Sequence, residues 1–116
     1  MNELIQMPAS ALATRIRCGE VTAREVIEAH VERIERVNPA LNALVVERFE
    51  AARAEAAEAD ARIAAAPPGA VLPPLLGVPF TVKEFMQVAG LPNTAGSVYR
   101  VGLTASKDAP VVTRMR

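Results

Sequence analysis

The chain has 116 residues, of which 51% are hydrophobic, and its 13 basic side chains balance its 13 acidic ones. This length allows one modest core, and the apolar content excludes intrinsic disorder. The zero net charge and an aromatic content of 3% argue against nucleic acid as a partner, because binding it calls for a basic surface and stacking side chains.

The cellular compartment is indicated by three features of the sequence. The single cysteine, Cys18, excludes an internal disulfide and is typical of a reducing compartment. No stretch approaches the roughly 18 to 20 apolar residues that a membrane span needs. The first residues lack the basic and apolar regions of a secretory signal. We therefore expect a cytoplasmic protein without a membrane span.

Helical patterns begin early, and the first two predicted helices span about residues 9–18 and 22–37. Thr22 and Glu25 form the pattern of a capping box, in which each side chain accepts a hydrogen bond from the backbone N–H of the other. We expect Pro39 to end this helix, because the residue before a proline is pushed out of the helical region.

Two further helices are predicted downstream. Residues 51 to 66 contain ten alanines, and the high helix propensity of alanine predicts a helix over 49–66. Its apolar face is made of small side chains, so we expect this helix to lie on the surface. Residues 109–116 open like a helix, with Asp108 as a candidate cap and Pro110 in the first turn.

Two segments have strand character, 42–47 and 78–83. The second is a compact apolar run that ends in two charges, which predicts a buried strand with Lys83 and Glu84 at its carboxyl end. A stable sheet needs at least three strands, and the last helical pattern reaches Arg116 without a cap or a breaker. Both observations favour the interpretation that the chain is a piece of a longer protein.

Lys83 is the residue that stands out chemically. In α/β folds, ligand-binding and catalytic groups often lie at the carboxyl ends of strands. A lysine there can become a general base when partial burial disfavours its charged form. The alternative is a structural ion pair between Lys83 and Glu84 or a more distant carboxylate, and spacing alone favours this alternative.

The sequence around Lys83 resembles the amidase signature family. Residues 76–84 read LGVPFTVKE and residues 88–97 read VAGLPNTAGS. Members of the family typically carry a Gly-[Ile/Val]-Pro-x-x-[Val/Ile]-Lys-[Asp/Glu] strand and then a Gly-x-x-Thr-[Ala/Thr]-x-Gly-Ser-type loop. The resemblance extends upstream through the first two helices and so covers essentially the whole chain. Glu84 stands where Asp is commoner in the family, and Asn93 where Thr is common.

The resemblance implies an α/β fold of the amidase-signature type, a mixed sheet flanked by helices. Residues 1–116 would be the N-terminal fragment of a single amidase domain and would hold only its first helices and the strand that carries Lys83. The implied reaction is hydrolysis of a carboxamide (C–N, non-peptide) bond through a serine acyl-enzyme, with Lys83 as general base acting through a bridging serine. No cofactor and no metal are implied.

The two serines of that mechanism do not transfer to this chain. Its serines are Ser10, Ser97 and Ser106, whereas those of the family lie downstream in a Gly/Ser-rich signature that is absent here. Ser97 matches a loop serine of the family that is not the nucleophile. We therefore expect the chain to be inactive by itself. The expected partner is a small-molecule amide, and homo-oligomerisation is left open.

Two alternative functions remain. Within the family, the chain resembles part of a glutamine amidohydrolase, the A-type subunit of the amidotransferases. Outside it, the chain would be a non-catalytic helical interaction module. Such a module would dock through the apolar stripe of the second predicted helix, which comprises Val26, Ile27, His30, Val31, Ile34 and Val37.

Overall fold

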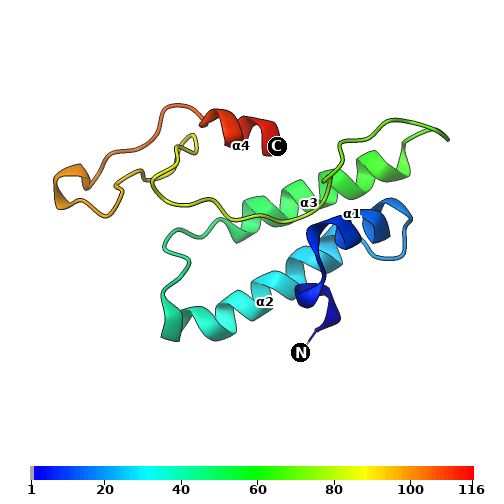
Figure 1. Ribbon diagram of the computed structural model, residues 1–116, viewed down its shortest axis with the longest axis horizontal. Helices are drawn as coiled ribbons and strands as arrows, with labels where there is room; N and C mark the ends of the chain where they lie inside the picture. The colour runs from blue at the N-terminus through cyan, green and yellow to red at the C-terminus, as the bar shows by residue number, and fades with distance from the viewer. Residues whose placement is uncertain (1) are drawn as a thin grey trace. The chain divides into compact units, whose positions relative to one another are not determined.

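A computed structural model describes residues 2–116, which divide after Pro79 into two compact units (Figure 1). The elements of the first unit are η1 (Glu3–Gln6), α1 (Ala9–Arg17), α2 (Ala23–Leu41) and α3 (Phe49–Ala64). Those of the second unit are η2 (Val98–Arg100) and α4 (Pro110–Met115). The α-helices thus occupy the segments that the sequence predicts as helical, and their bounds differ from the predicted ones by a few residues.

The start of α2 is fixed by side chains from two parts of the chain. Thr22 Oγ1 accepts from the Glu25 N–H at 3.1 Å and Glu25 Oε2 accepts from the Thr22 N–H at 2.8 Å, so the predicted capping box is present. Hydrogen bonds from Thr22 hold the pKa of Glu25 below its ordinary value. Asp60 of α3 accepts from the N–H groups of Ala23 at 2.7 Å and Arg24 at 3.2 Å. Side chains thereby satisfy N–H groups that have no partner within the helix.

Replacing Asp60 with alanine is expected to lower the free energy of unfolding by about 1–2 kcal/mol, the usual effect of losing a helix cap. The Ala23 N–H would lose its acceptor although Ala23 is fully buried. Glu58→Ala is the matched control, because Glu58 is exposed on the same helix. Urea denaturation measures both variants, and equal unfolding midpoints for the two would contradict the capping role.

Helix α3 packs antiparallel against α2 (Figure 1). Asp60, near the end of α3, bonds to the start of α2 at Ala23, and Arg53, nearer the start of α3, bonds to Glu28 further along α2. Ala56 and Ala59 are buried. The other residues of α3 are exposed or half-buried, so the helix lies at the surface and packs through one face whose small side chains let the two helices approach closely. The buried core cluster draws on all three helices of the unit and comprises Leu12, Ile16, Ala23, Val26, Ala56 and Ala59.

Helix α2 continues past Pro39 to Leu41, further than predicted. Asn42 takes up a left-handed conformation with φ of 48° and donates its N–H to the Asn38 carbonyl at 2.7 Å. The Asn38 side chain exchanges two hydrogen bonds with the backbone of Leu44, each at 2.8 Å. A proline near a helix end removes only one late hydrogen bond, and the asparagines complete the C-terminus beyond it.

Neither predicted strand forms, because residues 2–116 contain no strand ladder. The 42–47 segment has the backbone of Leu44 bonded to the Asn38 side chain, and 78–83 finds no extended neighbour among the described residues. In the described part of the chain, an isolated antiparallel bridge joins Pro92 to Thr104. A strand exists through hydrogen bonds to an adjacent strand, so the expected mixed sheet is not seen in this part of the chain.

Gly77 lets the segment that leads toward Lys83 lie against the helical core of the first unit. It has a φ of +83°, and a Cβ built there would lie 2.9 Å from the Ala23 Cβ and 3.2 Å from the Ile16 Cγ2. Its neighbours Leu76 and Val78 pack against the core cluster. Only glycine combines this backbone conformation with such a close approach.

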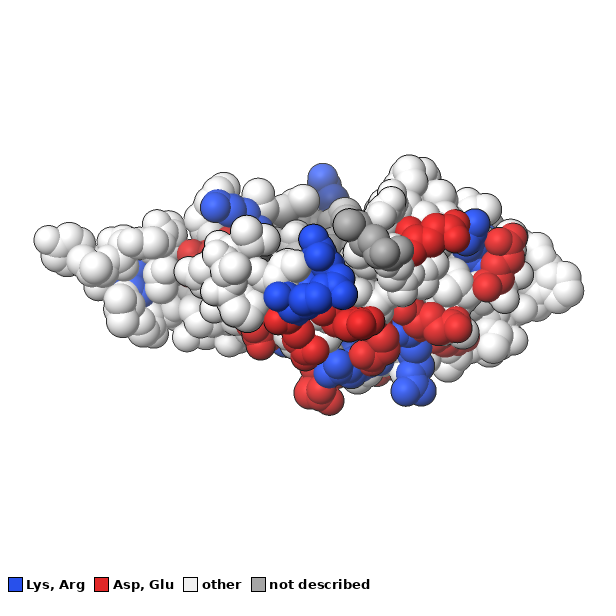
Figure 2. All heavy atoms as spheres, turned by 90° about the horizontal axis from the view of Figure 1, so that it is seen from below, with Lys and Arg blue, Asp and Glu red and all other residues white. Residues whose placement is uncertain are grey.

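Charged side chains of both signs are interspersed on the face of the molecule that Figure 2 shows. Among the charged pairs of the chain, Arg15 lies 3.2 Å from Glu3, and Arg48 lies 2.8 Å from Glu55. No helix within residues 2–116 is long and apolar enough to cross a membrane.

Candidate active site

Lys83 lies in the second unit, in the irregular segment that opens it. Its side chain is exposed and lines a hollow of about 250 Å³. The other lining residues are mainly apolar and comprise Phe80, Thr81, Val82, Met86, Val111, Val112 and Met115. Within residues 2–116 the Lys83 ammonium has no hydrogen bond or ion pair, so the alternative of a structural ion pair with Glu84 is not realised there.

The backbone turns directly after Lys83. The Met86 N–H donates to the Lys83 carbonyl at 2.8 Å. The neighbouring Glu84 points its carboxylate at a later loop, where it accepts from the N–H groups of Thr94 at 2.5 Å and Ala95 at 2.7 Å. These hydrogen bonds, that of Thr94 above all, hold the pKa of Glu84 below its ordinary value. Glu84 is therefore an ionised anchor for the loop and not a partner of the lysine.

Asn93 is a buried polar side chain with an exposed fraction of 5%. Its Nδ2 donates to the carbonyl oxygens of Glu84 at 3.1 Å and Phe85 at 2.9 Å. Its Oδ1 accepts from Arg100 Nη2 at 3.0 Å. Both ends of the amide are thereby bonded, as a buried polar group requires. The side chain fastens the turn after Lys83 to the loop that follows.

The structure brings no serine to Lys83 within the described residues. Ser10 belongs to α1 in the first unit, and Ser106 is exposed. Ser97 donates its backbone N–H to the Thr94 carbonyl at 3.0 Å and so helps to close the loop. None of these hydroxyl groups is hydrogen-bonded to the lysine.

The sequence indicates Glu84 as an alternative ion-pair partner of Lys83 and, like Asn93, as a departure from the family pattern, and it gives Asn93 no role. A signal was nevertheless present. A carboxylate next to a candidate base is followed by a loop rich in Pro, Asn and Gly, whose backbone N–H groups need acceptors. The sequence does not show which of these N–H groups donate to the Glu84 carboxylate once the loop has folded.

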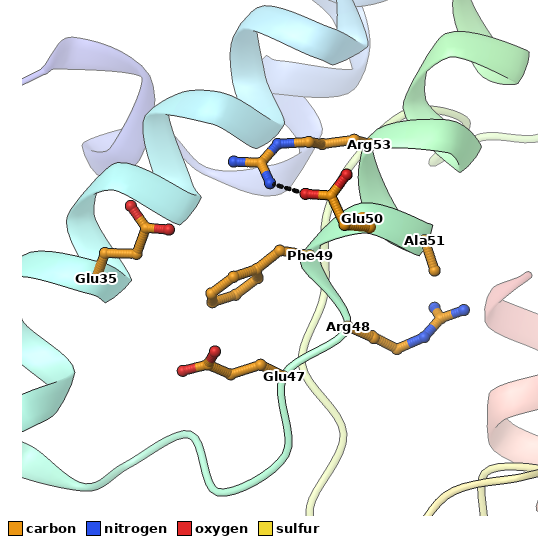
Figure 3. Close-up of a pocket in the computed structure, with 7 residues that line it drawn as sticks. All are labelled: Glu35, Glu47, Arg48, Phe49, Glu50, Ala51 and Arg53. Atoms are coloured by element: carbon orange, nitrogen blue, oxygen red, sulfur yellow. Dashed lines mark hydrogen bonds and ion pairs between the residues drawn. The ribbon is translucent and has the colours of Figure 1, made fainter.

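A second hollow, of about 370 Å³, lies where α3 begins in the first unit (Figure 3). Its lining includes Arg53, which donates to Glu28 at 2.8 Å and to Glu50 at 2.5 Å. These pairs raise the pKa of Arg53, and the hydrogen bond from Arg53 lowers the pKa of Glu28. The guanidinium beside this hollow is thus occupied by carboxylates of the chain, through one ion pair between α2 and α3 and one within α3.

The class of protein is established by a family model described as Amidase, which matches residues 25–116 and so includes Lys83. The chain belongs to the amidase family. The resemblance to the amidase signature family is thereby confirmed, and with it membership of a family of amide-hydrolysing enzymes.

Among individual relatives, fatty-acid amide hydrolase 2-B of Danio rerio is 44% identical over 119 residues, which cover 99% of this chain and 23% of that protein. The A-type subunit of glutamyl-tRNA(Gln) amidotransferase from Acidothermus cellulolyticus is 40% identical over 116 residues, 100% of this chain and 22% of that protein. The chain therefore spans less than a quarter of the length of these relatives.

A solved structure has the same fold over the shared region. It is described as an inhibitor-bound, unexpected vestigial protein complex that reveals the evolutionary origins of an s-triazine catabolic enzyme. Its TM-score to this chain is 0.84 at 35% identity, and the match covers 94% of this chain and 23% of that one.

Proposed function

We propose that this chain carries the catalytic lysine of a longer amidase (the longer enzyme). That enzyme hydrolyses a carboxamide (C–N, non-peptide) bond. The observation that carries the proposal is the exposed Lys83 ammonium, which has no partner among residues 2–116 and lines an apolar hollow. A lysine side chain that is not held in an ion pair is free to contact a serine that the rest of the longer enzyme brings to it.

In the proposed reaction, Lys83 is the general base and takes a proton through a bridging serine from a nucleophilic serine. That serine attacks the amide carbonyl, ammonia or an amine leaves, and water hydrolyses the acyl-enzyme. Ser10, Ser97 and Ser106 make no hydrogen bond to Lys83. The two serines and the oxyanion-hole donors are therefore assigned to residues outside the 116.

The same reasoning leads us to propose that the 116 residues alone are inactive. Their match to less than a quarter of each relative supports their assignment to one part of an amidase domain, and we propose that this is the N-terminal part of a single domain. In that domain 78–83 would become a strand once neighbouring strands of the mixed sheet are present. The single cysteine, Cys18, is free and exposed, which supports a reducing, cytoplasmic setting.

A second candidate activity is hydrolysis of glutamine as part of an amidotransferase. The observation that favours it is the 40% identity to the amidotransferase component of Acidothermus cellulolyticus. A non-catalytic docking module has no such support. Part of the apolar stripe that it would use is occupied within the chain, since Val26 and Val31 are at most 1% exposed.

Ammonia release by the longer enzyme tests the proposed function. The purified enzyme is given a primary amide of a fatty acid, or glutamine, and ammonia is measured over time. We expect release from the fatty-acid amide if the enzyme is a free-standing amidase, and from glutamine if it is the amidotransferase component. No release from any carboxamide would contradict the proposal. Turnover by the isolated 116 residues that disappears in Lys83→Ala would contradict the assignment of the serines to another part of the enzyme.

A further inference from the structure

We infer that Asn93, together with Glu84, is a positioning residue that fixes the backbone at Lys83 and thereby the placement of its amine. This role rests on the proposed function of Lys83. The contacts that carry it are reciprocal: the Asn93 side chain bonds the backbone after Lys83, and the Glu84 side chain bonds the backbone after Asn93. We call this set of contacts the 84–95 clamp.

The first half of the clamp fixes two carbonyl groups directly after a third that is held by a backbone turn. The Lys83 carbonyl accepts from the Met86 N–H at 2.8 Å. The next two carbonyls, of Glu84 and Phe85, both accept from the single Nδ2 of Asn93, at 3.1 and 2.9 Å. Rotation of the backbone immediately after Lys83 would break at least one of these bonds. The buried Asn93 amide is therefore placed to hold the point from which the lysine side chain leaves.

The second half of the clamp orients the Asn93 amide itself. Arg100 Nη2 donates to Asn93 Oδ1 at 3.0 Å, which directs the Nδ2 hydrogens toward the two carbonyls. The Glu84 carboxylate accepts from the Thr94 and Ala95 N–H groups and holds the loop that bears Asn93 in place. Ala95 has a left-handed φ of 51°, a conformation that the surrounding hydrogen bonds stabilise.

This placement matters because the reacting nitrogen of a lysine lies at the end of four rotatable bonds. A small rotation of the backbone is amplified along the side chain, and a misplacement of about 1 Å in a catalytic group can lower a rate about 100-fold. A clamp that only supports the loop would leave turnover per correctly folded enzyme unchanged. A clamp that positions Lys83 would lower that turnover.

Asn93→Asp in the longer enzyme separates these two cases, because a carboxylate cannot donate to the carbonyls of Glu84 and Phe85. We expect kcat per active site to fall about 10- to 100-fold with little change in KM, as for a loss of orientation in the transition state. A covalent serine-directed reagent gives the number of active sites, and circular dichroism monitors folding. Asn42→Asp is the matched control, because Asn42 is exposed and lies in the first unit, and we expect wild-type kcat there.

A kcat within about twofold of wild type in Asn93→Asp, with Lys83→Ala inactive, would overturn the positioning role alone. An active Lys83→Ala enzyme would overturn the proposed function and the positioning role with it. If Asn93→Asp does not fold, Glu84→Gln takes its place, since it replaces one carboxylate oxygen by an amide and leaves Asn93 intact. We expect kcat to fall in folded Glu84→Gln and to recover in Glu84→Asp, which restores the carboxylate. Wild-type kcat in Glu84→Gln would overturn the role.

Discussion

Lys83→Ala is expected to lower kcat of the longer enzyme for amide hydrolysis by about 10²- to 10⁴-fold, the usual contribution of a general base. The substitution removes the amine and leaves the hydrogen bonds to the carbonyls of residues 83–85 in place, since none of them involves the Lys83 side chain. Because Lys83 is exposed and has no partner among the described residues, its loss should leave the free energy of unfolding nearly unchanged.

The chain offers a matched control in its other lysine, Lys107, which is also exposed in the second unit. Steady-state kinetics on the two alanine variants compare equal changes in charge and side-chain size. We expect wild-type kcat in Lys107→Ala. Similar small effects in both variants would remove Lys83 from the catalytic role.

Gly77→Ala is expected to lower the free energy of unfolding by about 2–4 kcal/mol, through left-handed backbone strain and a steric clash. The residue has a φ of +83°, and the added Cβ would lie 2.9 Å from the Ala23 Cβ. Ala23 is fully buried at the capped start of α2, so it has little room to move. The substitution would therefore loosen the segment leading toward Lys83 from the helical core.

Gly69→Ala is the control that separates the cost of backbone strain from the cost of the steric clash. Gly69 has a similar φ of +79°, but nothing lies within 4 Å of a Cβ placed there. Gly69→Ala should therefore lower the free energy of unfolding only through left-handed backbone strain, by about 1–2 kcal/mol. Chemical denaturation of both variants gives the difference, which measures the clash alone. Equal losses would show that the contacts with Ala23 and Ile16 do not constrain Gly77.

The features of the fold that were predictable from sequence are those set by neighbours in the chain. The capping box of Thr22 and Glu25 spans one helical turn, so its pattern is legible in four letters. The cap from Asp60 was not predictable, because Asp60 lies 37 residues from Ala23 and reaches it only when α3 packs on α2. The two predicted strands are not formed within residues 2–116 for a related reason, since a strand depends on a neighbouring strand that local sequence does not contain.

In the candidate site, too, local features could be predicted from the sequence and contacts between distant residues could not. Lys83 could be identified because the family motif is local and surrounds it. The clamp could not, because Asn93 meets Glu84 and Phe85 only after the chain has turned back across 8 or 9 residues. Composition shows that Asn93 lies in a loop, and the structure shows that its amide is buried and bonded at both ends.

Chemical rescue tests most directly the central claim that the amine of Lys83 performs proton transfer in amide hydrolysis. Lys83→Ala in the longer enzyme is assayed for ammonia release with increasing concentrations of small primary amines. The account predicts that turnover is very low without added amine and rises with amine concentration, because a free amine takes the place of the missing side chain. It predicts no such rise for Asn93→Asp, which retains its lysine. Turnover near the wild-type level in Lys83→Ala without any added amine would contradict the claim.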